Sequence, residues 1–261
     1  HRTCTRERRR MSALTVARID LKRLAVRPFA WTLAGIALAM MAWQFLLGVS
    51  AFLHAQPAVP GAAAGPGFTD TVVAPYLLNY IQLCLVIAPL VTMQALAGER
   101  GAGRLVLLSA SGATAAQIVF GKFCARLAFL WLLLMLVATL PLVLAPATHP
   151  DWGQFGAALI ASALCVAALT AIGIACSAFT PEPALAAAAA LLIGEALSLI
   201  DAGVRLTGGD TGWLGYLALH THLAPALRGL VRSEDIVYFL IVIVLALALA
   251  IRRVGGDRER G

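Results

Sequence analysis

Charged residues are scarce in this chain, and their scarcity excludes an ordinary soluble domain. Asp, Glu, Lys and Arg make up 13% of the residues, whereas about a quarter of residues are charged in an average soluble domain. Hydrophobic residues account for 61% of the chain, and the mean hydropathy is +0.87. This balance predicts an integral membrane protein.

Cysteine pairs and a phosphate-binding loop are lacking as well. The five cysteines show no paired spacing and four fall in or beside apolar runs, so we interpret those four as small core residues. Gly121-Lys122 has the ending of a phosphate-binding loop, but the position that requires the partner glycine is Ala116. Whatever supplies energy to this protein is therefore expected on another chain.

Six apolar runs are present. The first four exceed the length of about 20 residues that a helix needs to cross a bilayer, and the last two are close to its lower limit of about 17 residues. The runs cover about residues 29–53, 72–96, 118–144, 155–179, 184–200 and 236–251. Basic residues precede the first run, as in a signal peptide, but the run exceeds the usual apolar length of such a signal. The fold class expected is an all-α membrane protein with six transmembrane helices.

Prolines subdivide these runs. Pro89 lies well inside the second run and predicts either a bend or a gating joint. Pro141 and Pro146 are expected to close the third span. Between Asp201 and Asp235 the sequence is mixed, which predicts short external helices or re-entrant half-helices before the sixth span.

The segment before the first span is amphipathic. Small and leucine residues recur on one face at helical spacing and basic residues occupy another, namely Leu14, Ala17, Leu21 and Leu24 against Arg18, Lys22 and Arg23. This pattern predicts an interfacial helix on the membrane surface that ends where Pro28 turns the chain into the bilayer. Residues 1–11 are expected to be an upstream extension or a disordered tail.

The basic residues indicate the orientation of the spans. Of the twenty Lys and Arg, nine precede Pro28, four follow Ile251 and four lie between residues 97 and 126. The loops on the opposite side hold only Arg205, Arg228 and Arg232, so both termini are expected in the cytosol. Basic residues that bracket an apolar body fit anionic membrane lipids as partners better than nucleic acid.

The polar stretch between the second and third runs carries a pattern of charged, glycine and leucine residues. Its motif residues are Gly98, Glu99, Arg100, Gly103, Leu105, Leu107 and Leu108, then Gln117, Ile118, Val119, Gly121 and Lys122. With the opening residues 17–22 and 27–31, this pattern resembles ABC-2 type transporter permeases and is similar to their gliding-motility-like branch. The resemblance covers nearly all of residues 11–253. Arg104, Val106 and Gly112 stand where the branch has Thr, Glu and Pro.

The resemblance implies a function. It implies an ABC-2 type transmembrane domain over residues 12–253, followed by a cytosolic tail at 254–261, in a bacterial cytoplasmic (inner) membrane. By this resemblance, the chain is the permease subunit of an ATP-driven exporter and is not an enzyme. A separate ATP-binding subunit carries ATP and Mg²⁺, and it docks on the loop 97–126 and on the N-terminal helix. A second permease copy or a paralogue completes a dimer. The residues expected to couple to the ATPase are Glu99, Arg100, Gly103, Arg104, Leu108, Gly121 and Lys122. The alternative is structural: these charges only anchor the ends of the spans at the lipid head groups.

Other polar residues within or beside the spans leave alternatives open. Glu195 lies in the fifth run, where an ionised side chain is costly. Either it lines a translocation path or dimer seam, or it makes a structural hydrogen bond within the bundle, or the fifth span ends earlier than residue 200. The histidines expected outside have weak metal-ligand spacing, so no metal site is expected. The competing function classes are an intramembrane enzyme and a small channel, neither coupled to ATP. The substrate is not encoded in any motif of the chain.

Overall fold

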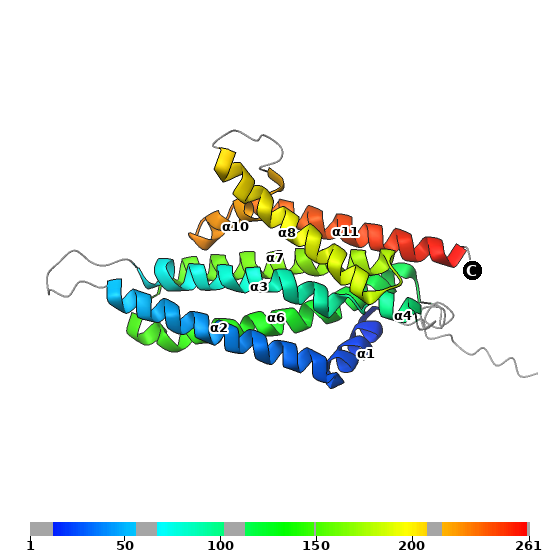
Figure 1. The fold of residues 1–261 in the computed structure, drawn as a ribbon, viewed down its shortest axis with the longest axis horizontal. Helices are drawn as coiled ribbons and strands as arrows, with labels where there is room; N and C mark the ends of the chain where they lie inside the picture. The colour runs from blue at the N-terminus through cyan, green and yellow to red at the C-terminus, as the bar shows by residue number, and fades with distance from the viewer. Residues whose placement is uncertain (1–12, 56–66, 102–112, 149, 208–215, 260–261) are drawn as a thin grey trace, which may run out of the picture.

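The computed structural model describes residues 13–55, 67–101, 113–148, 150–207 and 216–259. Within these ranges the protein is helical and has no strand. Six of its helices are long and apolar enough to cross a membrane, as the sequence predicts. They run along the long axis of the molecule, and α1 (Ala13–Val26) lies across one end of them, beside α4 (Ala97–Gly101) (Figure 1).

All of the spans except the second are longer than the apolar runs that predict them. The spans are α2 (Pro28–Ala55), α3 (Ala74–Thr92) with the π-helical turn η1 (Thr69–Val73) before it, α6 (Ala115–Thr148), α7 (Trp152–Phe179), α8 (Pro183–Thr207) and α11 (Ser233–Glu259). The prediction that Pro141 and Pro146 close the third span is wrong, because both prolines lie inside α6. The predicted tail after residue 253 begins within α11.

Helix α7 is the centre of the bundle. Of its most apolar window 78% is buried, against 17% for α2, and α7 packs against α3, α6, α8, α10 and α11. Glycine allows the closest of these approaches, since a Cβ atom at Gly173 of α7 would lie 2.1 Å from Thr92 Oγ1 of α3. Cys84, Cys165 and Cys176 are buried in this core as free thiols, which confirms their interpretation as core residues.

The second span ends in a short break. Helix α3 ends at Thr92, and α4 begins only at Ala97. The Ser177 hydroxyl of α7 accepts hydrogen bonds of 3.0 Å from the backbone N–H groups of Leu96 and Ala97 and donates one of 3.0 Å to the Met93 carbonyl. One side chain of the central helix therefore satisfies three backbone groups that the break leaves open.

At the opposite end of the bundle, α10 (Leu219–Leu227) is tied to α11 and to α7. His222 Nε2 is 2.9 Å from the Tyr216 carbonyl, and its Nδ1 is 2.7 Å from Asp235 Oδ1. A carbonyl oxygen only accepts, so the hydrogen bond to Tyr216 needs a proton on His222 Nε2. The hydrogen bond between His222 and Asp235 needs a second proton, carried either by Nδ1 or by the carboxyl group. Gln154 of α7 donates to Asp70 Oδ1 at 2.7 Å and to the Leu227 carbonyl at 2.9 Å.

Tyrosines of α3 satisfy backbone groups of α6. Pro141 has no N–H, so the Val137 carbonyl four residues earlier has no helical donor. The Tyr76 hydroxyl donates to this carbonyl at 3.1 Å. Tyr80 donates to the Leu130 carbonyl at 2.9 Å, but residue 134 is Leu134 and has its own N–H to offer. The Tyr76 bond therefore stabilises the proline-containing part of α6 inside the membrane.

We expect Tyr76→Phe to lower the free energy of unfolding by about 1 kcal/mol, because it leaves a buried carbonyl unpaired. Pro141→Ala restores a helical donor for Val137, so the same substitution in that background should cost much less. Tyr80→Phe is the matched control and should cost less than Tyr76→Phe. Unfolding of the purified protein by SDS in mixed micelles measures the effect of each substitution. An equal effect of Tyr76→Phe in the wild type and in the Pro141→Ala background would contradict the role of Tyr76 at the Val137 carbonyl.

Candidate functional site

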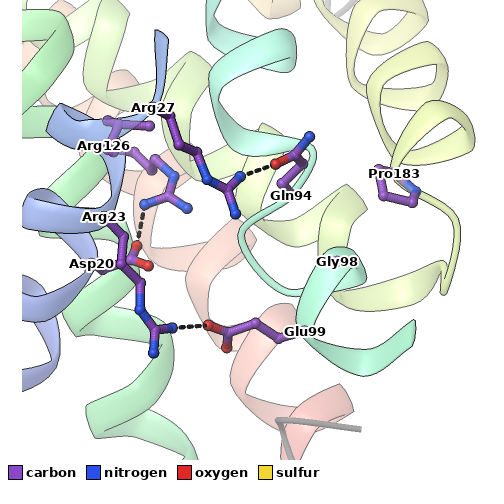
Figure 2. A pocket seen from close by; sticks show the side chains of 9 residues that line it. Asp20, Arg23, Arg27, Gln94, Gly98, Glu99, Arg126 and Pro183 are labelled. Carbon is purple, nitrogen blue, oxygen red and sulfur yellow. Dashed lines mark hydrogen bonds and ion pairs between the residues drawn. The ribbon is translucent and has the colours of Figure 1, made fainter. Parts of the chain in front are cut away.

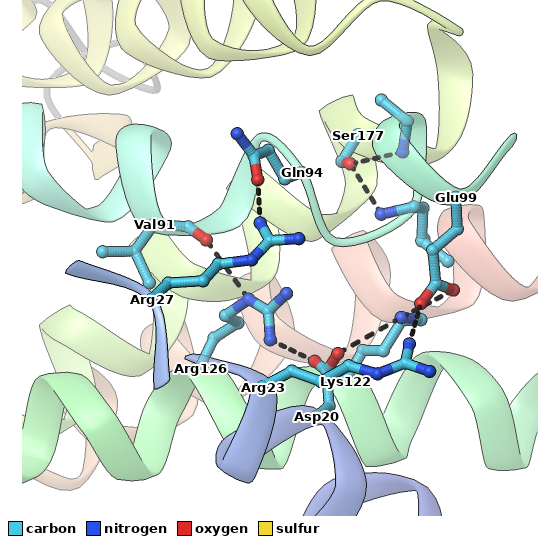
Figure 3. Close-up of polar contacts among 11 residues, drawn as sticks. Asp20, Arg23, Arg27, Val91, Gln94, Glu99, Lys122, Arg126 and Ser177 are labelled. Atoms are coloured by element: carbon cyan, nitrogen blue, oxygen red, sulfur yellow. Dashed lines mark hydrogen bonds and ion pairs between the residues drawn. The ribbon is translucent and has the colours of Figure 1, made fainter. Parts of the chain in front are cut away.

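Charged side chains from three helices converge where α1 crosses the bundle. Asp20 and Arg23 come from α1, Glu99 from α4, and Lys122 and Arg126 from the first turns of α6. Figure 3 shows these side chains pointing toward one another between α1 and the connection of α3 to α4. We call these five residues the charged cluster.

The charged cluster is held by ion pairs. Lys122 Nζ is 2.8 Å from Glu99 Oε2 and 3.6 Å from Asp20 Oδ1. Arg126 forms an ion pair with the second oxygen of Asp20. Arg23 Nη1 donates to Glu99 Oε1 at 3.4 Å from a side chain that is 54% exposed. Each carboxylate therefore contacts two cations, and Lys122 joins the two carboxylates.

Most of the charged cluster is buried. Lys122 is 1% exposed, and Asp20, Glu99 and Arg126 are each 5% exposed. A buried ion that loses its partner costs about 3–5 kcal/mol, because neither water nor an opposite charge then compensates it. The charged cluster thus fixes α1, α4 and α6 relative to one another, since separating the helices would leave these charges uncompensated.

Hydrogen bonds to the end of α3 extend the charged cluster. Arg126 Nε donates to the Val91 carbonyl at 3.2 Å, one of the last carbonyls of α3, where a cation also complements the helix dipole. Arg27, at the corner between α1 and α2, donates to the side-chain oxygen of Gln94 in the break after α3. Asp20, Arg126 and Val91 thus form a chain from α1 through α6 to α3.

A close contact of backbones brings α1 within reach of α6. A Cβ atom at Gly121 would lie 2.7 Å from the Ala13 carbonyl oxygen and 2.8 Å from Val16 Cβ, so no larger residue fits without moving α1. The face that α1 buries consists of Val16, Asp20 and Leu24. Leu14 and Leu21, which the sequence assigns to one apolar face with Leu24, are exposed.

The residues predicted to couple to an ATPase have several different environments. Glu99, Gly121 and Lys122 are buried at the contacts described above. Arg100 is partly buried, and its Nη1 donates to the Ala178 carbonyl at 2.5 Å near the end of α7. Gly103, Arg104 and Leu108 lie outside the described residues. The structure thus brings Glu99 and Lys122 together and ties Arg100 to a different helix.

Sequence reasoning missed three members of the charged cluster, Asp20, Arg23 and Arg126, of which Arg23 was assigned only to the polar face of the amphipathic helix. A signal was present, because Asp20 lies four residues from both Val16 and Leu24 and so interrupts an apolar stripe with a carboxylate. Arg126 lies four residues after Lys122, on the same face of α6. That spacing marks Asp20 and Arg126 as candidate buried charges, but it does not pair them with each other.

Glu195 lies away from the charged cluster. It is half-buried on α8, next to Gly194, whose position for a Cβ atom is 3.1 Å from Leu85 of α3. No hydrogen bond or ion pair of Glu195 is present in the part of the chain that the structure describes. The structural hydrogen bond that the sequence offers as an alternative role for Glu195 is therefore not present among the described residues.

The charged cluster is suited to hold helices together. Its two carboxylates each contact two of its three cations, and no Ser, Cys or His belongs to it. Across the described ranges, no three His, Cys, Asp or Glu side chains converge as metal ligands.

We expect Gly121→Ala to lower the free energy of unfolding by about 1–3 kcal/mol, because the added methyl group meets backbone of α1. Gly156→Ala in α7 is the matched control, since nothing lies within 4 Å of its Cβ position. Thermal unfolding of both purified variants measures the difference. An equal effect of the two substitutions would contradict the tight contact of α1 with α6.

The comparison with known families agrees with this architecture. The family model described as ABC-2 family transporter protein matches residues 78–209. The match begins in α3 and ends beyond α8, and it includes Glu99, Lys122 and Arg126 of the charged cluster. No curated protein matches the chain. Half of this chain matches the family model, and six of its helices can cross a membrane, so the protein belongs to the ABC-2 family of transporters and is a multi-pass membrane permease.

Proposed function

We propose that this chain is the permease subunit of an ATP-driven exporter whose ATP is hydrolysed by a separate subunit. That subunit docks on the segment 97–126 and on α1, and it supplies ATP and Mg²⁺. Family membership supports a transport role, and Ala116 in place of a required glycine supports the assignment of ATP binding to a partner. The residues of this chain transmit the conformational change and bind no nucleotide.

The observation that carries the proposal is the charged cluster. A ligand shifts a conformational equilibrium only through different affinities for two states, so the binding of ATP to a partner must reach the spans through a rigid contact. Helix α4 is such a contact, because Glu99 connects it to α1 and α6 while Ser177 and Arg100 connect it to α7. A force on α4 therefore acts on three other helices at once.

The same proposal includes the finer assignments. The chain belongs to the gliding-motility-like branch, resides in a bacterial inner membrane with both termini in the cytosol, and pairs with a second copy or a paralogue. Helix α1 lies in the membrane interface, supported by its exposed Leu14 and Leu21. Helix α10 is a short external helix, and Glu195 lines the translocation path or the seam between the two permeases, supported by the lack of an internal partner in the described ranges.

We expect Glu99→Gln to retain the ATP-binding subunit but to lower the stimulation of its ATP hydrolysis about fivefold or more, because a buried link of α4 to Lys122 is lost. Glu182→Gln, an exposed glutamate in the turn before α8, is the matched control and should leave stimulation unchanged. The test is affinity purification of each variant from native membranes, identification of the copurified ATPase, and an ATP hydrolysis assay in proteoliposomes. Purification of the wild-type chain without any ATPase would refute the proposed function.

The orientation has its own test. After the five native cysteines are replaced, a cysteine at Arg18 should react with a membrane-impermeant maleimide only in opened cells, whereas one at Arg228 should react in intact cells. Both side chains are exposed, so access to the reagent decides the outcome. Reaction at position 18 in intact cells would place α1 outside and contradict docking of a cytosolic ATPase there.

A further inference from the structure

A polar pocket lies beside the charged cluster, at the corner between α1 and α2. It has a volume of about 270 Å³, and its walls come from α1, from the break after α3, from α6, and from the starts of α4 and α8. Figure 2 shows Arg27 beside Gln94 and Arg23 beside Glu99, with Pro183 of α8 across the pocket. Three guanidinium groups, those of Arg23, Arg27 and Arg126, line it.

Cations outnumber carboxylates at this pocket. Asp20 and Glu99 face four cations, since Arg27 lies beside the charged cluster with its three cations. In the described ranges Arg27 contacts a neutral partner, the Gln94 amide oxygen, and forms no ion pair. The four cations therefore exceed the two carboxylates by two charges, and Arg27 is the cation that contacts no carboxylate within the described ranges. Guanidinium groups bind phosphate through paired N–H donors, so a phosphate group fits this excess in charge and in geometry.

An apolar crevice continues from the polar pocket toward the membrane-spanning part of the bundle. The two share Leu24, Arg27, Gln94 and Arg126, and the crevice is otherwise lined by Phe29 and Ala30 at the start of α2 and by Leu90 and Val91 at the end of α3. Trp31 nearby is 56% exposed, and its indole donates to the Ala25 carbonyl at 2.6 Å, as is typical of tryptophans at a membrane interface. The crevice has a volume of only about 20 Å³, so it can receive the start of an acyl chain and not its whole length. Its apolar lining would not attract a free phosphate ion.

We propose that this pocket binds the phosphate group of an anionic phospholipid from the leaflet in which α1 lies, with the start of an acyl chain in the crevice between α2 and α3. The lipid head group balances the excess charge around Arg27 and Arg126. Because it contacts α1, α3 and α4 together, a bound lipid stabilises the contact of these helices. Family membership enters this lipid site only because it makes the chain a membrane protein. An ATPase partner is not required.

The test is a titration of the purified full chain in detergent, followed by native mass spectrometry. The probes are dioleoyl-phosphatidylglycerol, the zwitterionic dioleoyl-phosphatidylcholine, and inorganic phosphate as a competitor. We expect phosphatidylglycerol to bind with a defined stoichiometry and more tightly than phosphatidylcholine, and millimolar phosphate not to displace it. Equal binding of the two lipids to the wild-type chain would overturn the proposal. Displacement of phosphatidylglycerol by phosphate would overturn it as well.

A pair of arginine variants locates the site. Arg27→Gln should weaken the binding of phosphatidylglycerol about fivefold, as expected for one basic residue near an anionic lipid. Arg18→Gln removes the same charge from an exposed position of α1 outside the pocket and should leave the dissociation constant within about twofold. Equal weakening by both would indicate diffuse surface attraction and overturn the site. Unchanged lipid binding in Arg27→Gln with loss of a copurified ATPase would assign the pocket to a protein contact instead.

Discussion

The arrangement of this protein depends on the compensation of buried charge at one end of an otherwise apolar bundle. Asp20, Glu99, Lys122 and Arg126 are nearly excluded from solvent, and each is tolerable only while the others remain in contact. The ion pairs therefore act together with the few buried apolar residues of these helices, Val16 and Leu24 in α1 and Ala97 in α4, to fix how α1 and α4 sit against α6. At this end the fold is specified by electrostatics, whereas the middle of the bundle is specified by close packing around α7 and by hydrogen bonds to backbone carbonyls.

Much of the fold follows from the sequence, because the bilayer imposes a simple length rule. The six spans, the helical segment before Pro28 and the core location of three cysteines are all read from apolar runs. The span ends are less predictable. Pro141 suggests a helix end in the sequence, but the Tyr76 hydroxyl from α3 satisfies the Val137 carbonyl that this proline leaves free. Tyr76 and Val137 are 61 positions apart, so their contact has no signal in local sequence.

The candidate site shows the same division between local and distant information. Glu99 and Lys122 attract attention as charges between two apolar runs, and the structure joins them by a short ion pair. The second carboxylate that contacts Lys122, Asp20, was not predicted, because the connection crosses about a hundred residues and depends on Gly121 admitting the backbone of α1. Likewise, His222 is visible in the sequence as one of several histidines, while its pairing with Asp235 depends on how α10 folds against α11.

The claim that buried charge holds α1 to the bundle is tested most directly by a double-mutant cycle of Asp20→Asn and Arg126→Gln. The free energy of unfolding is measured for the wild type, both single variants and the double variant in the same detergent. The ion pair between the two side chains predicts a coupling energy of about 1–3 kcal/mol, so the double variant should be much less destabilised than the sum of the single variants. Additive effects of the two substitutions would contradict the account.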